Sequence, residues 1–116
     1  MIALAACGGR SKEAETVAAE DPLAAPVHVG TTSARAKFCG FIFDPARLRA
    51  NFLASRAQFT PPDQMQKVEK AYDYSFERVS GTIAEERNYC SKDRVEMIRR
   101  DINRYLAGDF TPPAKR

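Results

Sequence analysis

The feature that most constrains the fold is a long run of apolar residues at helical spacing in the middle of the chain. These residues recur at intervals of three or four positions, and they are Met65, Val68, Tyr72, Phe76, Val79 and Ile83. Such spacing places all of them on one side of an α-helix and does not match the two-residue period of a strand. We therefore expect a long amphipathic helix that continues to Tyr89 and Cys90, with Gly81 as its weakest point.

Helix start and stop signals lie on both sides of this run. Asp44 and Pro45 suit the start of a helix, because an Asp side chain caps free N–H groups and a proline needs no donor in the first turn. This helix is expected to end near Gln58 and to bury Leu48, Phe52 and Phe59. Thr60 and Pro61 are expected to be the N-cap and the first turn of the long helix.

The last helix is expected to start with Ser91 as its cap and to stop at Gly108, where glycine adopts a left-handed conformation at low cost. A brief helix is expected between Thr31 and Gly40, and nothing in the sequence requires a strand. With 116 residues, of which 44% are hydrophobic, the chain suits one small domain. We predict an all-α fold, a small bundle of three main helices formed by residues 31–116.

The N-terminal segment has a different composition. Between Gly8 and Gly30 it is rich in Ala, Glu and Pro, and acidic residues outnumber basic ones. Such a segment buries too little apolar surface to fold by itself. We therefore expect residues 1–30 to form a disordered leader, made of an export signal and a flexible tether.

Cys7 follows one apolar and two small residues, and Gly8 and Gly9 come next. The sequence Leu4-Ala5-Ala6-Cys7 resembles the lipobox of bacterial lipoproteins, in which the cysteine is lipidated and becomes the new N-terminus. Only six residues precede Cys7, whereas an export signal carries an apolar region of about 7–15 residues. The resemblance therefore implies a shortened signal, and the alternative is a chance match in a cytosolic N-terminus.

The lipobox resemblance implies a location. Lipidated Cys7 would hold the mature protein on a membrane of the cell envelope, facing the periplasm, and Gly8 resembles lipoproteins of the outer membrane. A soluble periplasmic or cytoplasmic protein is the alternative. More distantly, Phe38-Cys39-Gly40, the long helix and Tyr89-Cys90 resemble small helical exported proteins of alphaproteobacteria without an assigned function, which implies no active-site residue.

Once Cys7 is assigned to a lipid, Cys39 and Cys90 remain, and an even number of cysteines is typical of an oxidising compartment. We predict that they form a disulfide; two free cysteines in the core are the alternative. A metal site is disfavoured, because neither cysteine belongs to a C-x-x-C pair and the only histidine, His28, falls in the expected tether. No metal and no cofactor is therefore expected.

The candidate catalytic groups of the sequence are nucleophiles and paired acids. Serine and cysteine nucleophiles need a neighbouring base, and His28 is badly placed for that role. The acid pairs Glu85-Glu86 and Asp73 with Glu77 fit the solvated side of a helix better than a catalytic site. Phe-Thr-Pro-Pro occurs at Phe59 and again at Phe110, but the residues that follow share nothing, so this is no internal repeat.

These observations predict a non-enzymatic interaction or assembly module whose partners are the membrane, through Cys7, and another envelope protein. A net charge of +3 with mixed signs does not favour nucleic acid. The alternatives are a small envelope hydrolase or glycan-acting enzyme that uses helix carboxylates, and a soluble helical partner-binding protein. The oligomeric state stays open. The candidate surface contacts are Tyr74, Arg99, Arg100 and Arg104.

Overall fold

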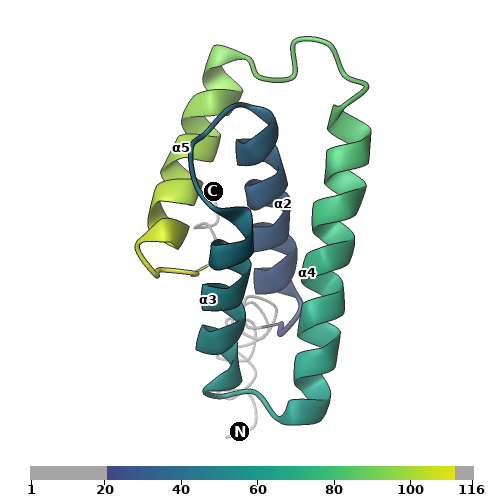
Figure 1. The fold of residues 1–116 in the computed structure, drawn as a ribbon, viewed down its shortest axis with the longest axis vertical. Coiled ribbons are helices and arrows are strands. Elements are labelled where there is room, and N and C mark those ends of the chain that lie inside the picture. Colours follow the sequence, from purple (N-terminus) through teal and green to yellow (C-terminus); the bar gives the residue numbers. More distant parts are fainter. Residues whose placement is uncertain (1–20, 112–116) are drawn as a thin grey trace, which may run out of the picture.

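The computed structural model describes residues 21–111, which form four α-helices and no strand (Figure 1). The helices are α2 (Ala24–Phe38), α3 (Pro45–Ala57), α4 (Pro62–Ile83) and α5 (Lys92–Leu106). Helix α2 packs against each of the other three, with α4 and α5 on its two sides. The all-α prediction is therefore confirmed, whereas the prediction of three main helices is short by one.

The additional helical turns come from the N-terminal segment. Helix α2 begins at Ala24, and Ala25, Val29 and Gly30 are buried. The expectation of a flexible tether as far as Gly30 is therefore wrong for Ala24 to Gly30. His28, expected in that tether, lies on the exposed side of α2. Helix α2 packs against three helices, so its buried positions do not gather on one side and give no one-sided apolar pattern in the sequence.

Helix α3 starts as expected. The Oδ1 atom of Asp44 accepts hydrogen bonds from the backbone N–H groups of Ala46 (3.1 Å) and Arg47 (3.2 Å). Leu48 and Phe52 are buried, as predicted. The prediction that Phe59 is also buried is wrong, because α3 ends at Ala57 and the following turn leaves Phe59 64% exposed.

Helix α4 carries the predicted apolar stripe, and Val68, Tyr72 and Ile83 within it are buried. Both of its ends differ from the expectation. The N-cap is Pro61 rather than Thr60, and the helix stops at Ile83 instead of continuing to Cys90. The stop coincides with the end of the stripe, since residues 84–88 are exposed and, after Ala84, all polar.

Helix α5 starts and stops where the sequence indicates. The Oγ atom of Ser91 accepts a hydrogen bond from the N–H of Arg94 (3.3 Å), and Gly108 has a φ of +93° just beyond the end of the helix. Phe110 then turns back onto the bundle. Its ring centroid lies 5.2 Å from that of Phe52 and 6.1 Å from that of Tyr105, so Phe110 belongs to the core although Asp109 and Thr111 on either side of it are exposed.

One hydrophobic core joins all four helices. Its largest fully buried side chains are Tyr72, Tyr105, Phe52 and Leu48. Among residues 21–111, none of the helices combines the length and the apolar composition that crossing a bilayer requires.

Candidate functional site

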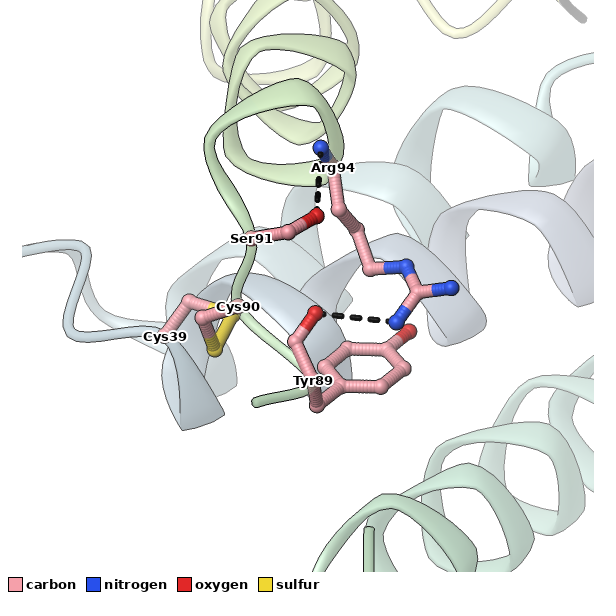
Figure 2. Close-up of a disulfide and its surroundings, with 5 residues drawn as sticks. All are labelled: Cys39, Tyr89, Cys90, Ser91 and Arg94. Carbon is pink, nitrogen blue, oxygen red and sulfur yellow. Dashed lines mark hydrogen bonds between the residues drawn. A yellow bond between two sulfur atoms is a disulfide. The ribbon is translucent and has the colours of Figure 1, made fainter. Parts of the chain in front are cut away.

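The disulfide lies at one end of the bundle (Figure 2). Cys39 follows the last residue of α2, and Cys90 immediately precedes Ser91, the cap of α5. The Cα atoms of the two cysteines are 5.7 Å apart and the sulfur atoms are bonded. The predicted pairing is confirmed, although Cys90 lies in the loop between α4 and α5 rather than at the end of the long helix.

Contacts around the disulfide add to this junction. The rings of Phe38 and Tyr89 meet edge to face, with centroids 6.0 Å apart. The guanidinium of Arg94 lies 4.2 Å from the ring centroid of Tyr89, and its Nη1 donates a hydrogen bond to the Tyr89 carbonyl oxygen (2.9 Å; Figure 2). The residue before each cysteine therefore helps to fix α2 against the start of α5.

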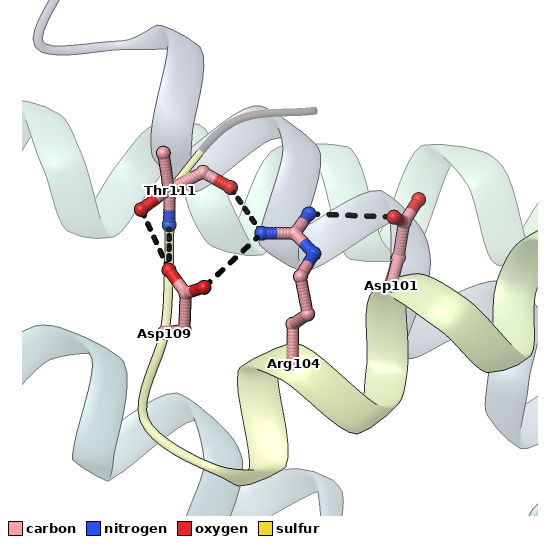
Figure 3. Close-up of polar contacts among 4 residues, drawn as sticks. All are labelled: Asp101, Arg104, Asp109 and Thr111. Atoms are coloured by element: carbon pink, nitrogen blue, oxygen red, sulfur yellow. Dashed lines mark hydrogen bonds and ion pairs between the residues drawn. The ribbon is translucent and has the colours of Figure 1, made fainter. Parts of the chain in front are cut away.

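Arg104, one of the candidate surface contacts, is held by contacts to other residues of the same chain (Figure 3). Its Nη1 donates to the carbonyl oxygen of Thr111 (2.8 Å), and its Nη2 donates to Oδ1 of Asp101 (3.3 Å). Asp109 lies 3.8 Å away and accepts hydrogen bonds from the side chain and the backbone N–H of Thr111, which lower the pKa of Asp109. Arg104 thus anchors the C-terminal turn formed by residues 108–111.

The other candidate contacts are exposed but do not form one site. Tyr74, 62% exposed on α4, accepts a hydrogen bond from Nη1 of Arg78 (2.8 Å). Arg99 lies 3.9 Å from Glu96 on α5, with its guanidinium 5.2 Å from the ring centroid of Phe41, and Arg100 is also exposed on α5. Helices α4 and α5 lie on opposite sides of α2 (Figure 1), so Tyr74 is separated from the two arginines. Their role as partner contacts stays a prediction.

The remaining predicted residues are Cys7 and the candidate acids. Cys7, the predicted lipidation site, lies outside the described residues. Among the candidate acids, Asp73 is bound by Arg49 through two hydrogen bonds, of 2.8 and 2.9 Å. The remaining acids, Glu77, Glu85 and Glu86, are exposed.

The structure also contains a cavity of about 700 Å³ at the end of the bundle away from the disulfide. Its wall comes from four separate segments: the start of α2, the end of α3, the turn into α4, and the C-terminal turn. The lining residues are Asp21, Pro22, Ala25, Ser55, Arg56, Phe59, Thr60, Pro61, Gln64, Gly108, Asp109, Phe110 and Thr111.

The sequence contained one sign of this cavity, the repeated Phe-Thr-Pro-Pro. The two copies are no structural repeat, since Phe59 is 64% exposed whereas Phe110 is 8% exposed. Nevertheless, Phe59 and Thr60 line the cavity together with Phe110 and Thr111. Nothing in the sequence alone indicated that the two copies meet, because the chain between them first crosses the whole bundle.

Arg56 is the only cation in the cavity wall that the structure describes. Its guanidinium lies 4.9 Å from the ring centroid of Phe59 and 5.9 Å from that of Phe52. Its Nε is buried and has no hydrogen-bond partner among residues 21–111, and no acid in this range lies within ion-pair distance. Burial lowers the pKa of Arg56 from its ordinary value, because desolvation disfavours the charged form.

The acids of the cavity wall have partners of their own. Asp21 accepts a hydrogen bond from the N–H of Leu23 (2.9 Å), and Asp109 is engaged by Thr111 and Arg104. Within residues 21–111, no three metal-ligating side chains gather closely enough to hold a metal ion. The cavity wall, with Arg56 and several polar side chains, is suited to hydrogen bonding and ion pairing with a ligand.

Comparisons with protein-family models, with curated proteins and with solved structures found no match to this chain.

Proposed function

We propose that this protein is a lipid-anchored cell-envelope protein that acts as a non-enzymatic interaction or assembly module. The observation that carries the proposal is the disulfide between Cys39 and Cys90. Disulfides of this kind persist in oxidising compartments and are rare in the cytosol. Together with the lipobox-like sequence that ends at Cys7, the disulfide favours a body outside the cytosol, held at a membrane by its N-terminus.

The distribution of polar groups supports a binding role over the hydrolase alternative. Acid–base catalysis by carboxylates needs two acids that face one bound substrate. Asp73 is instead paired with Arg49, and Glu77 is exposed to solvent. The 700 Å³ cavity and exposed side chains such as Tyr74 offer surfaces for binding.

The anchor is tested by mass spectrometry of the protein made in a bacterial host from a gene that includes any upstream coding sequence. We expect a mass that exceeds the cleaved chain by two or three acyl chains and recovery in the membrane fraction. Cys7→Ala should abolish both results, whereas Cys90→Ser, the matched control, should leave acylation intact. An unmodified chain with reduced Cys39 and Cys90 in the cytosol would contradict the proposal.

The interaction role is tested by crosslinking in intact cells, followed by purification from envelopes. A defined crosslinked partner should be lost or weakened in Tyr74→Ala or in Arg99→Ala, because both side chains are exposed. Lys67→Ala, at an exposed position of α4, is the control and should keep the partner. Crosslinking that yields only the monomer in the wild type would count against an assembly role.

A further inference from the structure

The cavity at the end of the bundle contains a cation, Arg56, that has no counter-ion among residues 21–111. Arg56 has a buried Nε that no described residue accepts from, although such buried donors are normally paired. The Nε of Arg35 also lacks a partner among residues 21–111, but Arg35 does not line this cavity. Arg56 differs because its Nε, without a partner in the same range, lies beside an open space of about 700 Å³.

The groups around Arg56 define what else the ligand would contact. The ring of Phe59 stacks with the guanidinium and is 64% exposed, so one part of it stays available. Pro22 and Pro61 extend this apolar surface. Polar groups in the same wall, Ser55 and Gln64 among them, can take part in hydrogen bonds. A ligand with an aromatic or aliphatic body and an acidic group would match these apolar and polar parts of the wall.

The charge balance limits how many negative charges the ligand carries. A guanidinium presents donors in a planar fork that matches carboxylate and phosphate oxygens. The carboxylate side chains of Asp21 and Asp109 also line the cavity. A second negative charge on the ligand would meet repulsion from these two acids, whereas a single one can be compensated by Arg56.

We propose that this cavity binds a small organic monocarboxylate, whose carboxylate pairs with Arg56 and whose apolar body lies against Phe59. This binding activity goes beyond the proposed envelope role and does not depend on lipidation of Cys7. It requires only the folded body, because every group that carries the argument lies within residues 21–111.

The test is a titration of the ¹⁵N-labelled full chain, followed by NMR, with three related probes. Phenylacetate should produce saturable shifts at Phe59, Thr60 and Gln64. Phenylacetamide, which lacks the charge, should bind at least about tenfold more weakly, as expected for loss of one charge-assisted contact. Phenyl phosphate, with its additional charge, should also bind more weakly than phenylacetate.

Variants locate the site. Arg56→Gln should weaken phenylacetate binding at least about tenfold, a loss expected for a charged partner. Arg47→Gln removes an exposed arginine of the same helix and should change the affinity less than about twofold, as expected for a distant and screened charge. Thermal unfolding of both variants checks that the body remains folded. Phe59→Ala should weaken the binding of all three probes, because each carries a phenyl ring, without changing the order of their affinities.

Four results would overturn the proposal. The first is the absence of saturable shifts in the full chain, and the second is equal binding of phenylacetate and phenylacetamide. The third is tighter binding of phenyl phosphate, which would replace the monocarboxylate with a phosphate-bearing ligand. An equal loss of affinity in Arg47→Gln and Arg56→Gln would place binding elsewhere and would also contradict it.

Discussion

Gly30 of α2 lies against the backbone of α4, so closely that a β-carbon at this position would sit 2.7 Å from the carbonyl oxygen of Tyr72. The contact between α2 and α4 is the most extensive between any two helices that the structure describes. A glycine at the crossing lets the two backbones approach, and this approach brings Tyr72 into the core beside Phe52.

Gly30→Ala should therefore destabilise the fold by about 1–3 kcal/mol, since the added methyl group overpacks a close crossing. Chemical denaturation followed by circular dichroism measures this loss. Gly81→Ala is the matched control, because nothing lies within 4 Å of a β-carbon there and Gly81 is inside α4. It should stabilise the protein by about 0.5–1 kcal/mol through helix propensity, and equal effects of both changes would refute the close crossing.

Loss of the disulfide should destabilise the body strongly. Cys39 and Cys90 are 51 positions apart, and closing such a loop restricts the unfolded chain by about 4 kcal/mol in the chain-entropy model. Cys90→Ser should lower the free energy of unfolding by several kcal/mol under oxidising conditions, measured as a lower melting temperature. Reducing agent should bring the wild type to the same value, and an unchanged melting temperature in Cys90→Ser would be incompatible with this prediction.

The ion pair between Arg49 of α3 and Asp73 of α4 should contribute only modestly. Its geometry is bidentate, with distances of 2.8 and 2.9 Å, but the side chains are 38% and 47% exposed. Solvent screening therefore limits the loss in Asp73→Asn to about 0.5–1 kcal/mol, and the loss should shrink in high salt. Glu77→Gln, the control on the exposed face of α4, should change stability less, and a loss unaffected by salt would contradict the electrostatic origin.

Tyr72 should make stability fall at alkaline pH. Burial raises the pKa of Tyr72 from 10.0 to about 12, so the folded state holds its proton more tightly than the unfolded state. The corresponding stability is present below pH 10 and is lost as the pH rises to about 12, with a magnitude on the order of 3 kcal/mol.

The measurement is the free energy of unfolding of the wild type and of Tyr72→Phe between pH 9 and pH 12. Tyr72→Phe should make the decline smaller, with Tyr105, whose pKa burial also raises, accounting for part of the remainder. The change should cost little at pH 7, since the hydroxyl of Tyr72 has no hydrogen-bond partner among residues 21–111. Ser33 lies near enough to lower the pKa of Tyr72 slightly, but the two hydroxyls do not meet in good geometry. Tyr74→Phe, at an exposed position, is the control and should keep the pH profile of the wild type. A pH profile of Tyr72→Phe identical to that of the wild type would show that the prediction is wrong.

Local chemistry made several features of the fold predictable. The caps at Asp44 and Ser91 and the left-handed glycine at Gly108 depend on hydrogen bonds within a few residues, so their signals lie in short stretches of sequence. The apolar stripe of α4 was equally clear, because its period alone identifies a helix. The position of its end was less predictable, because Tyr89 is apolar enough to extend the pattern although it belongs to the following loop.

Local sequence signals did not predict the candidate site. Arg56 is one of many arginines in the sequence. What distinguishes it is a buried Nε beside Phe59, with no acid partner among residues 21–111. The cavity itself requires four segments to converge. The sequence shows the two Phe-Thr-Pro-Pro copies, but it does not show that residues of both copies line one cavity.

The sequence by itself determined the helical class and the starts of α3 and α5, and it favoured the pairing of Cys39 with Cys90, because these depend on periodicity, local hydrogen bonding and a count of cysteines. Tertiary structure alone decided that Ala24 to Gly30 belong to the central helix and that Arg56 faces a shared cavity. The physical reason is that small side chains and single charges carry no pattern of their own. Their roles arise from the neighbours that packing places around them, and those neighbours are distant in the sequence.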